Sequence, residues 1–98
     1  MPTYVTLANF TEEGLDDVTE LPEHVEQMKE LKRSLGGEPM GFFLTFGRYD
    51  LVAISEMPDA ESTAQVQLTS AMQGAVETET LRAFSMDEAR DILADLPE

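Results

Sequence analysis

Tyr49 and Asp50 are the residues of this chain whose types and spacing come closest to a catalytic pair. A carboxylate whose pKa is raised by burial can act as a general base, and a neighbouring phenol can serve as a donor. Tyr49 and Asp50 are therefore the catalytic candidates. The alternative is structural: Asp50 accepts hydrogen bonds from turn amides, or pairs with Arg48 or Arg82, without taking part in catalysis.

Other polar residues stand on stretches that are otherwise apolar, and these are candidates for contact with a small ligand. Arg82 would either pair with one of the acids or anchor an anionic ligand. Tyr4 and Tyr49 would otherwise be interface aromatics. The full set of ligand-binding candidates is Tyr4, Asn9, Tyr49, Asp50, Thr78, Thr80 and Arg82.

Several familiar kinds of site are missing from the sequence. There is no cysteine, which excludes disulfides, thiolate metal sites and cysteine nucleophiles. His24 is the only histidine, so one subunit cannot build a multi-histidine metal site, and we expect His24 to be solvated at an acidic helix start. No phosphate-binding loop, nucleophile elbow or calcium loop occurs. We therefore expect neither a cofactor nor a metal.

The charge balance is extreme, with 20 Asp and Glu against 6 Lys and Arg and a net charge of −14. Such a charge destabilises a small compact chain at low salt and is screened at molar salt, where the Debye length is about 3 Å. The composition predicts a halophilic protein from a cell with concentrated internal salt; the alternative is an ordinary acidic protein of a mesophile. Nucleic-acid binding is disfavoured, because it requires a basic face.

Length and hydropathy indicate one domain, residues 1–98, in the cytoplasm. No apolar run approaches the ~18 residues of a membrane span. The N-terminal residues 1–4 lack the basic region and apolar core of a signal peptide. We therefore expect no contact with a membrane.

Strands and helices alternate along the chain. Runs rich in β-branched and aromatic residues predict strands over 3–10, 40–46, 49–55 and 76–84, the middle two joined by a tight turn at Gly47-Arg48. The predicted helices are 21–35, 60–73 after an Asp59 cap, and a short one that follows a Ser85–Glu88 capping box.

This order, β-α-β-β-α-β with a C-terminal helix, is the ferredoxin-like arrangement of the α+β class. Right-handed crossovers give a four-stranded antiparallel sheet of order 4-1-3-2 with two helices on one face. Apolar spacing predicts the inner face of the first helix as Leu21, Val25, Met28, Leu31 and Leu35. For the second helix it predicts Ala60, Ala64, Leu68, Ala71 and Met72, small enough for close packing on the sheet.

The hairpin of residues 40–55 has two apolar faces. A two-residue turn would pair Phe46 with Tyr49, Thr45 with Asp50, Leu44 with Leu51, and Phe43 with Val52. Successive pairs point to opposite faces, and two helices can cover only one of them. We therefore predict a homodimer in which the two uncovered sheets pack together. The alternative is that the final helix folds back over the open face.

The turn Gly47-Arg48-Tyr49-Asp50 is similar to the signature of the GYD-domain proteins: glycine, a variable residue, tyrosine and aspartate. Further segments match in the same order: Asn9-Phe10-Thr11 with Gly14, Pro22, Gly36-Gly37, Glu56 with Pro58, and Thr78 to Phe84. The resemblance covers nearly the whole chain and implies a dimeric α+β barrel, with no particular activity. His24 is a departure, because many members of that family have an arginine there.

Three classes of function follow from these observations. In the first class, the protein binds a small molecule between sheet and helices without catalysing a reaction, and this is the interpretation we favour. The second class is a cofactor-independent enzyme of the monooxygenase or isomerase kind, by analogy with the same barrel architecture. The third is a purely structural or regulatory dimerisation module. A dry cavity lined by Tyr49, Asp50 and Arg82 would favour the first two classes, and a filled interface between sheet and helices would favour the third.

Overall fold

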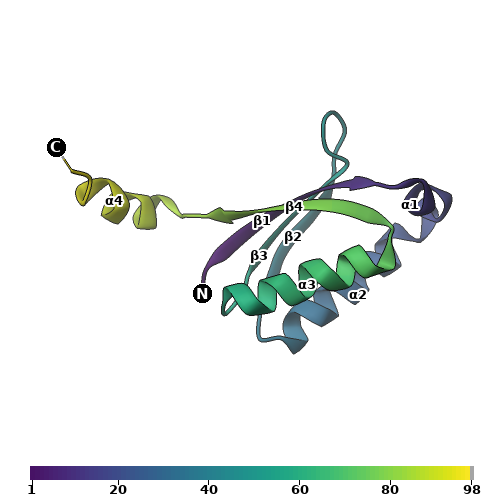
Figure 1. The fold of residues 1–98 in the computed structure, drawn as a ribbon, viewed down its shortest axis with the longest axis horizontal. Coiled ribbons are helices and arrows are strands. Elements are labelled where there is room, and N and C mark those ends of the chain that lie inside the picture. Colours follow the sequence, from purple (N-terminus) through teal and green to yellow (C-terminus); the bar gives the residue numbers. More distant parts are fainter. Residues whose placement is uncertain (98) are drawn as a thin grey trace.

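A four-stranded antiparallel sheet forms the centre of the computed structural model, which describes residues 1–97 (Figure 1). Its strands are β1 (Thr3–Phe10), β2 (Glu38–Leu44), β3 (Leu51–Glu56) and β4 (Val76–Ala83). They lie in the order β2-β3-β1-β4, which is the predicted order read from the other edge. The ferredoxin-like topology predicted from the sequence is therefore confirmed.

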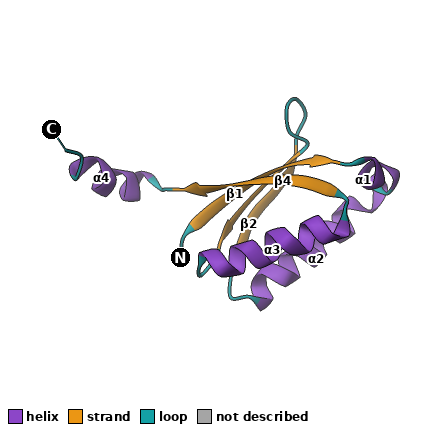
Figure 2. Cartoon of the chain, in the orientation of Figure 1, coloured by secondary structure: helices purple, strands orange, loops and turns teal. Residues whose placement is uncertain are grey.

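Two long helices cover one face of this sheet, side by side (Figures 1 and 2). They are α2 (Leu21–Ser34) and α3 (Ala60–Gln73); a short α1 (Glu12–Asp16) and a 3₁₀ turn (Val18–Glu20) lead into α2. Asp59 caps α3 by accepting a hydrogen bond of 2.8 Å from the Ser62 amide, and Gly74 ends it in the left-handed region. Both ends of α3 are those predicted.

The two helices differ in how well their inner faces were predicted. The stripe of α2 is at least half-buried at every predicted position, as a 3.6-residue period requires. The predicted inner face of α3 is wrong: Ala60, Ala64, Leu68, Ala71 and Met72 are all exposed. Leu68 is 64% and Met72 86% exposed, whereas Val66 is buried. The side of α3 that faces the sheet is small and polar, and includes Thr63 and Ser70. Apolar spacing alone therefore selected the wrong side.

The hairpin keeps the predicted register but not the predicted turn. Leu44 pairs with Leu51 and Phe43 with Val52, as expected. The strands end there, and residues 45–50 form a loop that extends beyond the sheet (Figure 1). Phe46 is fully exposed and is not paired with Tyr49.

The sheet face away from α2 and α3 is open. Side chains alternate along a strand, so the neighbours of the helix-facing residues point to this side. Its apolar residues are Val5, Leu7, Phe43, Val52, Ile54 and Leu81. The final helix α4 (Met86–Ala94) does not fold back over them; it projects from the end of β4, away from the sheet (Figure 1). This alternative for covering the open face is wrong.

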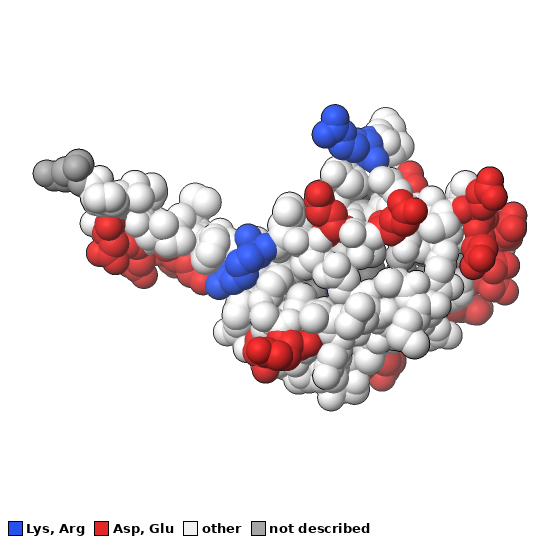
Figure 3. All heavy atoms as spheres, viewed as in Figure 1, with Lys and Arg blue, Asp and Glu red and all other residues white. Residues whose placement is uncertain are grey.

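Charge is distributed over the surface much as the composition suggests. On the face drawn in Figure 3, acidic side chains surround the molecule and follow α4. One basic group stands out at the β2–β3 loop and another near the start of α4. No helix within residues 1–97 is long and apolar enough to cross a bilayer.

Candidate ligand cavity

A cavity of about 120 Å³ lies between the sheet and the two long helices. Its sheet side is rich in hydroxyl groups, which come from Tyr4, Thr6, Ser55, Thr78 and Thr80. Its helix side is mixed: Val25 and Met28 of α2 and Val66 of α3 are apolar, and polar residues such as Thr63 and Ser70 lie beside them. A concave apolar space with a few converging polar groups is the usual form of a small-molecule site.

Lys32 of α2 lines the cavity and is only 5% exposed. Its Nζ donates a 2.7 Å hydrogen bond to Ser55 Oγ on β3. The same Nζ lies 4.6 Å from the centre of the Phe42 ring, within range of a cation–π contact. Burial removes water from the ammonium and lowers the pKa of Lys32 to about 8. Lys32 is therefore a poorly hydrated amine facing a cavity.

The end of α2 fixes the position of Lys32. Gly36, with φ of 87°, ends the helix in the left-handed region. The Gly37 amide donates a 2.8 Å hydrogen bond to the Lys32 carbonyl oxygen. A Cβ on Gly37 would lie 2.3 Å from Met57 Sδ, so only glycine allows this close approach between α2 and the end of β3. The lysine is thus held against the sheet by backbone as well as by its own side chain.

Sequence reasoning did not identify Lys32 as a candidate site residue. The signal was present in the spacing: Leu21, Val25, Met28, Lys32 and Leu35 follow steps of four and three residues. Leu31 fits this spacing almost as well as Lys32. A pattern based on apolar residues therefore selects the leucine and omits the lysine beside it. A lysine at an inward helical position is the feature that would have found the site.

Three of the ligand-binding candidates come together in this cavity, namely Tyr4, Thr78 and Thr80. The hydroxyls of Thr6 and Thr80 lie 3.4 Å apart across neighbouring strands. The other four candidates, Asn9, Tyr49, Asp50 and Arg82, are not among the residues that line it. The structure therefore divides the predicted set between two or more places.

Asp50 and Tyr49 lie where the β2–β3 loop meets β1. The Phe10 amide donates a 2.9 Å hydrogen bond to Asp50 Oδ2. In return, the Asp50 amide donates to the Ala8 carbonyl at 2.9 Å and to Asn9 Oδ1 at 3.1 Å. Asp50 thus accepts from a strand amide; no ion pair joins it to Arg48 or Arg82 within residues 1–97. The Tyr49 hydroxyl donates to Glu79 Oε2 at 3.2 Å.

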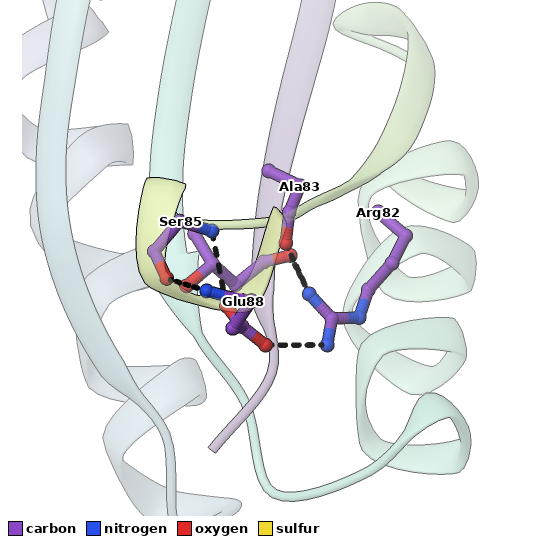
Figure 4. Close-up of polar contacts among 5 residues, drawn as sticks. Arg82, Ala83, Ser85 and Glu88 are labelled. Atoms are coloured by element: carbon purple, nitrogen blue, oxygen red, sulfur yellow. Dashed lines mark hydrogen bonds and ion pairs between the residues drawn. The ribbon is translucent and has the colours of Figure 1, made fainter. Parts of the chain in front are cut away.

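Arg82 lies at the far end of β4, where it joins the strand to α4 (Figure 4). Its guanidinium contacts Glu88 at 3.4 Å and the Ala83 carbonyl, and lies 4.4 Å from the Phe84 ring. Ser85 and Glu88 form the predicted capping box, with bonds of 3.0 and 3.1 Å. The Ser85 amide is the main cause that lowers the pKa of the Glu88 carboxyl. Arg82 is thus the partner of an acid, although its guanidinium is also 5.9 Å from the Tyr4 ring.

His24 lines the cavity and is half-buried, so the expectation of a solvated histidine is wrong. It stands on the inner side of α2, one residue before Val25. Among residues 1–97 no group of three or more histidine, aspartate or glutamate side chains is arranged to hold a metal ion. The cytoplasmic location stays a prediction.

Comparison with known proteins supports the resemblance to the GYD-domain proteins. Residues 4–93 match the GYD domain family. A protein of Thermus thermophilus, named "Glutamine synthetase and cystathionine beta-lyase binding protein", is 32% identical over 97 residues, which cover 98% of this chain and 99% of that protein. A crystal structure of a Thermus thermophilus protein is similar with a TM-score of 0.54 and 26% identity, covering 87% of this chain and 95% of that one.

Proposed function

The chain belongs to the GYD domain family, and from this premise we propose that it is a homodimeric binding protein that takes a compact small molecule between its sheet and helices. The observation that carries the proposal is the cavity itself. Its volume of about 120 Å³ is of the order of the ~150 Å³ cavity that accepts a benzene ring. Its lining combines hydroxyl groups with apolar side chains, which suits a ligand with one polar end.

Binding is favoured over catalysis by the position of the catalytic candidates. Tyr49 and Asp50 lie at the β2–β3 loop and do not line the cavity. Asp50 is engaged by the backbone amide of Phe10. A ligand in the cavity would therefore meet hydroxyls and an amine but neither of these two side chains.

The dimer is supported by the open face of the sheet. Six large apolar side chains on four strands have no helix over them within residues 1–97. A contiguous apolar patch on a small protein usually marks an interface. A second copy presents the same patch, so two sheets can pack face to face about a two-fold axis.

Native mass spectrometry of protein purified from cells tests the ligand proposal. We expect a dimer that carries one extra small mass per subunit. Ser70→Leu should fill the cavity from α3 and remove that mass, whereas Gln65→Leu, on the exposed side of the same helix, should keep it. A bare subunit mass in the unaltered protein, or an adduct that survives Ser70→Leu, would contradict the proposal.

Docking on a metabolic enzyme is a second candidate function. It is favoured by the full-length match to a relative whose name says that it binds glutamine synthetase and cystathionine beta-lyase. Sedimentation of this protein with each purified enzyme tests it directly. Co-migration at micromolar concentration is expected, and separate boundaries for both enzymes would exclude this function.

The halophilic character is part of the same proposal and depends on the net charge of −14. Screening should stabilise the chain, so the urea midpoint should rise between dilute buffer and molar potassium chloride. Equal midpoints would indicate an ordinary acidic protein.

A further inference from the structure

We propose that the ligand of the cavity is a compact monocarboxylate whose anionic head is held by Lys32. This inference rests on the proposed binding function and specifies the chemical class of the ligand. The apolar part of such a molecule would lie against α2 and α3, and its carboxylate against β3.

The first support is that Lys32 is buried without a protein counter-charge. Four of the six cations pair with a carboxylate at 3.3 to 3.5 Å, namely Lys29, Arg33, Arg82 and Arg90. Arg48 lies exposed on the β2–β3 loop. Lys32 is in none of the ion pairs of residues 1–97, although the chain holds 20 acids. An unpaired buried ammonium costs several kcal/mol, and an anionic ligand would offset that cost.

The second support is the hydrogen-bonding capacity left at the site. An ammonium has three donors, and Ser55 Oγ accepts one of them. Because Ser55 Oγ accepts from Lys32, its own proton is free to point toward a ligand. The described residues therefore offer a carboxylate an ammonium and a hydroxyl together, which is the arrangement that forms strong charge-assisted hydrogen bonds.

The third support concerns size and charge. One cation balances one negative charge, so a monoanion is favoured over a phosphate dianion or a polyanion. The acidic surface of the chain repels multiply charged anions further. The cavity volume limits the rest of the molecule to about the size of one ring. Benzoate, with its neutral isostere benzamide, is therefore a suitable pair of probes.

The test is a titration of benzoate and benzamide into the full-length protein, followed by amide chemical shifts, with three proteins compared. Lys32→Met removes the proposed anchor with a side chain of similar length. Lys29→Met removes the same charge from the same helix, at a partly exposed lysine paired with Glu26. We expect benzoate to bind at least tenfold more tightly than benzamide to the unaltered protein and to Lys29→Met. In Lys32→Met that preference should disappear.

The outcomes separate this inference from the proposed function. If both probes shift cavity residues with equal affinity, and Lys32→Met changes neither, the cavity binds ligands but the anionic class is wrong. If neither probe shifts cavity residues in the unaltered protein, the inference is wrong whatever co-purifies from cells. Should Lys32→Met not fold, Ser55→Ala keeps the ammonium and must retain the preference for benzoate, at reduced affinity; a preference lost there would assign recognition to the hydroxyl and overturn the inference.

Discussion

The two faces of the sheet are built differently. The face beneath α2 and α3 carries hydroxyl side chains such as Thr6 and Thr80 around a cavity. The open face carries aliphatic side chains such as Val52 and Ile54, and no helix of residues 1–97 covers it. The covered face also carries apolar residues such as Ala8, Phe42 and Leu51, as expected beneath helices. The departure is on the open face, because an antiparallel sheet with one face in water usually has polar residues there.

The difference between the faces favours the proposal that each is completed by a different kind of molecule outside the single chain. Exposed aliphatic side chains gain most from a flat apolar partner, which a second sheet provides. Hydroxyls and an amine around a small space gain most from a ligand that supplies hydrogen bonds and charge. The proposed dimer and the proposed ligand thus use opposite sides of the same sheet.

A charge at the centre of the open face should have the largest effect. Ile54 lies on β3 between Val5 of β1 and Gly41 of β2. Ile54→Asp would bury one unpaired carboxylate per subunit in a sheet-to-sheet interface, at several kcal/mol each, and symmetry doubles the cost. We expect the dimer to dissociate to monomers in light scattering at high salt.

Leu68→Asp is the matched control for this change. Leu68 is also aliphatic and is 64% exposed on the outer side of α3, away from the open face. The Leu68→Asp variant should leave the mass of the dimer unaltered. A dimer that survives Ile54→Asp but not Leu68→Asp would place the subunit interface on α3, and the aliphatic open face would then have no partner to explain it.

On the covered face, Lys32 should give stability a distinct pH dependence. Its pKa is about 8 in the folded chain, against 10.5 ordinarily. Below pH 8 both states are protonated and the folded chain bears the full cost of the buried charge. Between pH 8 and 10.5 only the unfolded chain holds the proton, so stability rises with pH, by about 3 kcal/mol in all. Lys32→Met should lack this rise and should equal or exceed the unaltered protein in stability at pH 7.

Urea unfolding of both proteins from pH 7 to pH 10.5 measures this difference. The same rise in Lys32→Met would show that Lys32 is solvated in the folded chain. The covered face would then no longer differ from the open face by a buried charged side chain.

The sequence predicts most of the open face but little of the covered one, for physical reasons. Strand alternation reports the faces of a sheet directly, which is why the pairs Leu44–Leu51 and Phe43–Val52 were predicted correctly. The cavity is lined by threonines, serines and a lysine, which hydropathy assigns to the surface. For the same reason the apolar side of α3, with Leu68 and Met72, was wrongly placed inside. The spacing of apolar residues defines the faces of a helix, but tertiary packing decides which face is buried.

The loop at residues 45–50 shows a second limit of the sequence. The short-range pattern favours a two-residue turn at Gly47-Arg48. The predicted pair of Thr45 and Asp50 is joined, since the Thr45 amide donates to the Asp50 carbonyl at 2.7 Å. Asp50 also bonds to Ala8, Asn9 and Phe10, about 40 residues away in the chain. Such long-range bonds cannot be inferred from local spacing, and they separate Tyr49 and Asp50 from the cavity.

The smallest expected effect comes from the hydroxyl pair of Thr6 and Thr80, and it sharpens the comparison most. Their Oγ1 atoms lie 3.4 Å apart, a weak contact between two side chains that valine matches in shape. Replacing both partners of a hydrogen bond by apolar isosteres is nearly neutral, so Thr6→Val with Thr80→Val should change unfolding stability by only about 0.5 kcal/mol. If these hydroxyls are there to hold a ligand, the double variant should still lose the extra small mass that we expect in native mass spectrometry. A large loss of stability together with an unchanged adduct would mean that the hydroxyls hold the fold, and that the covered face is an ordinary core.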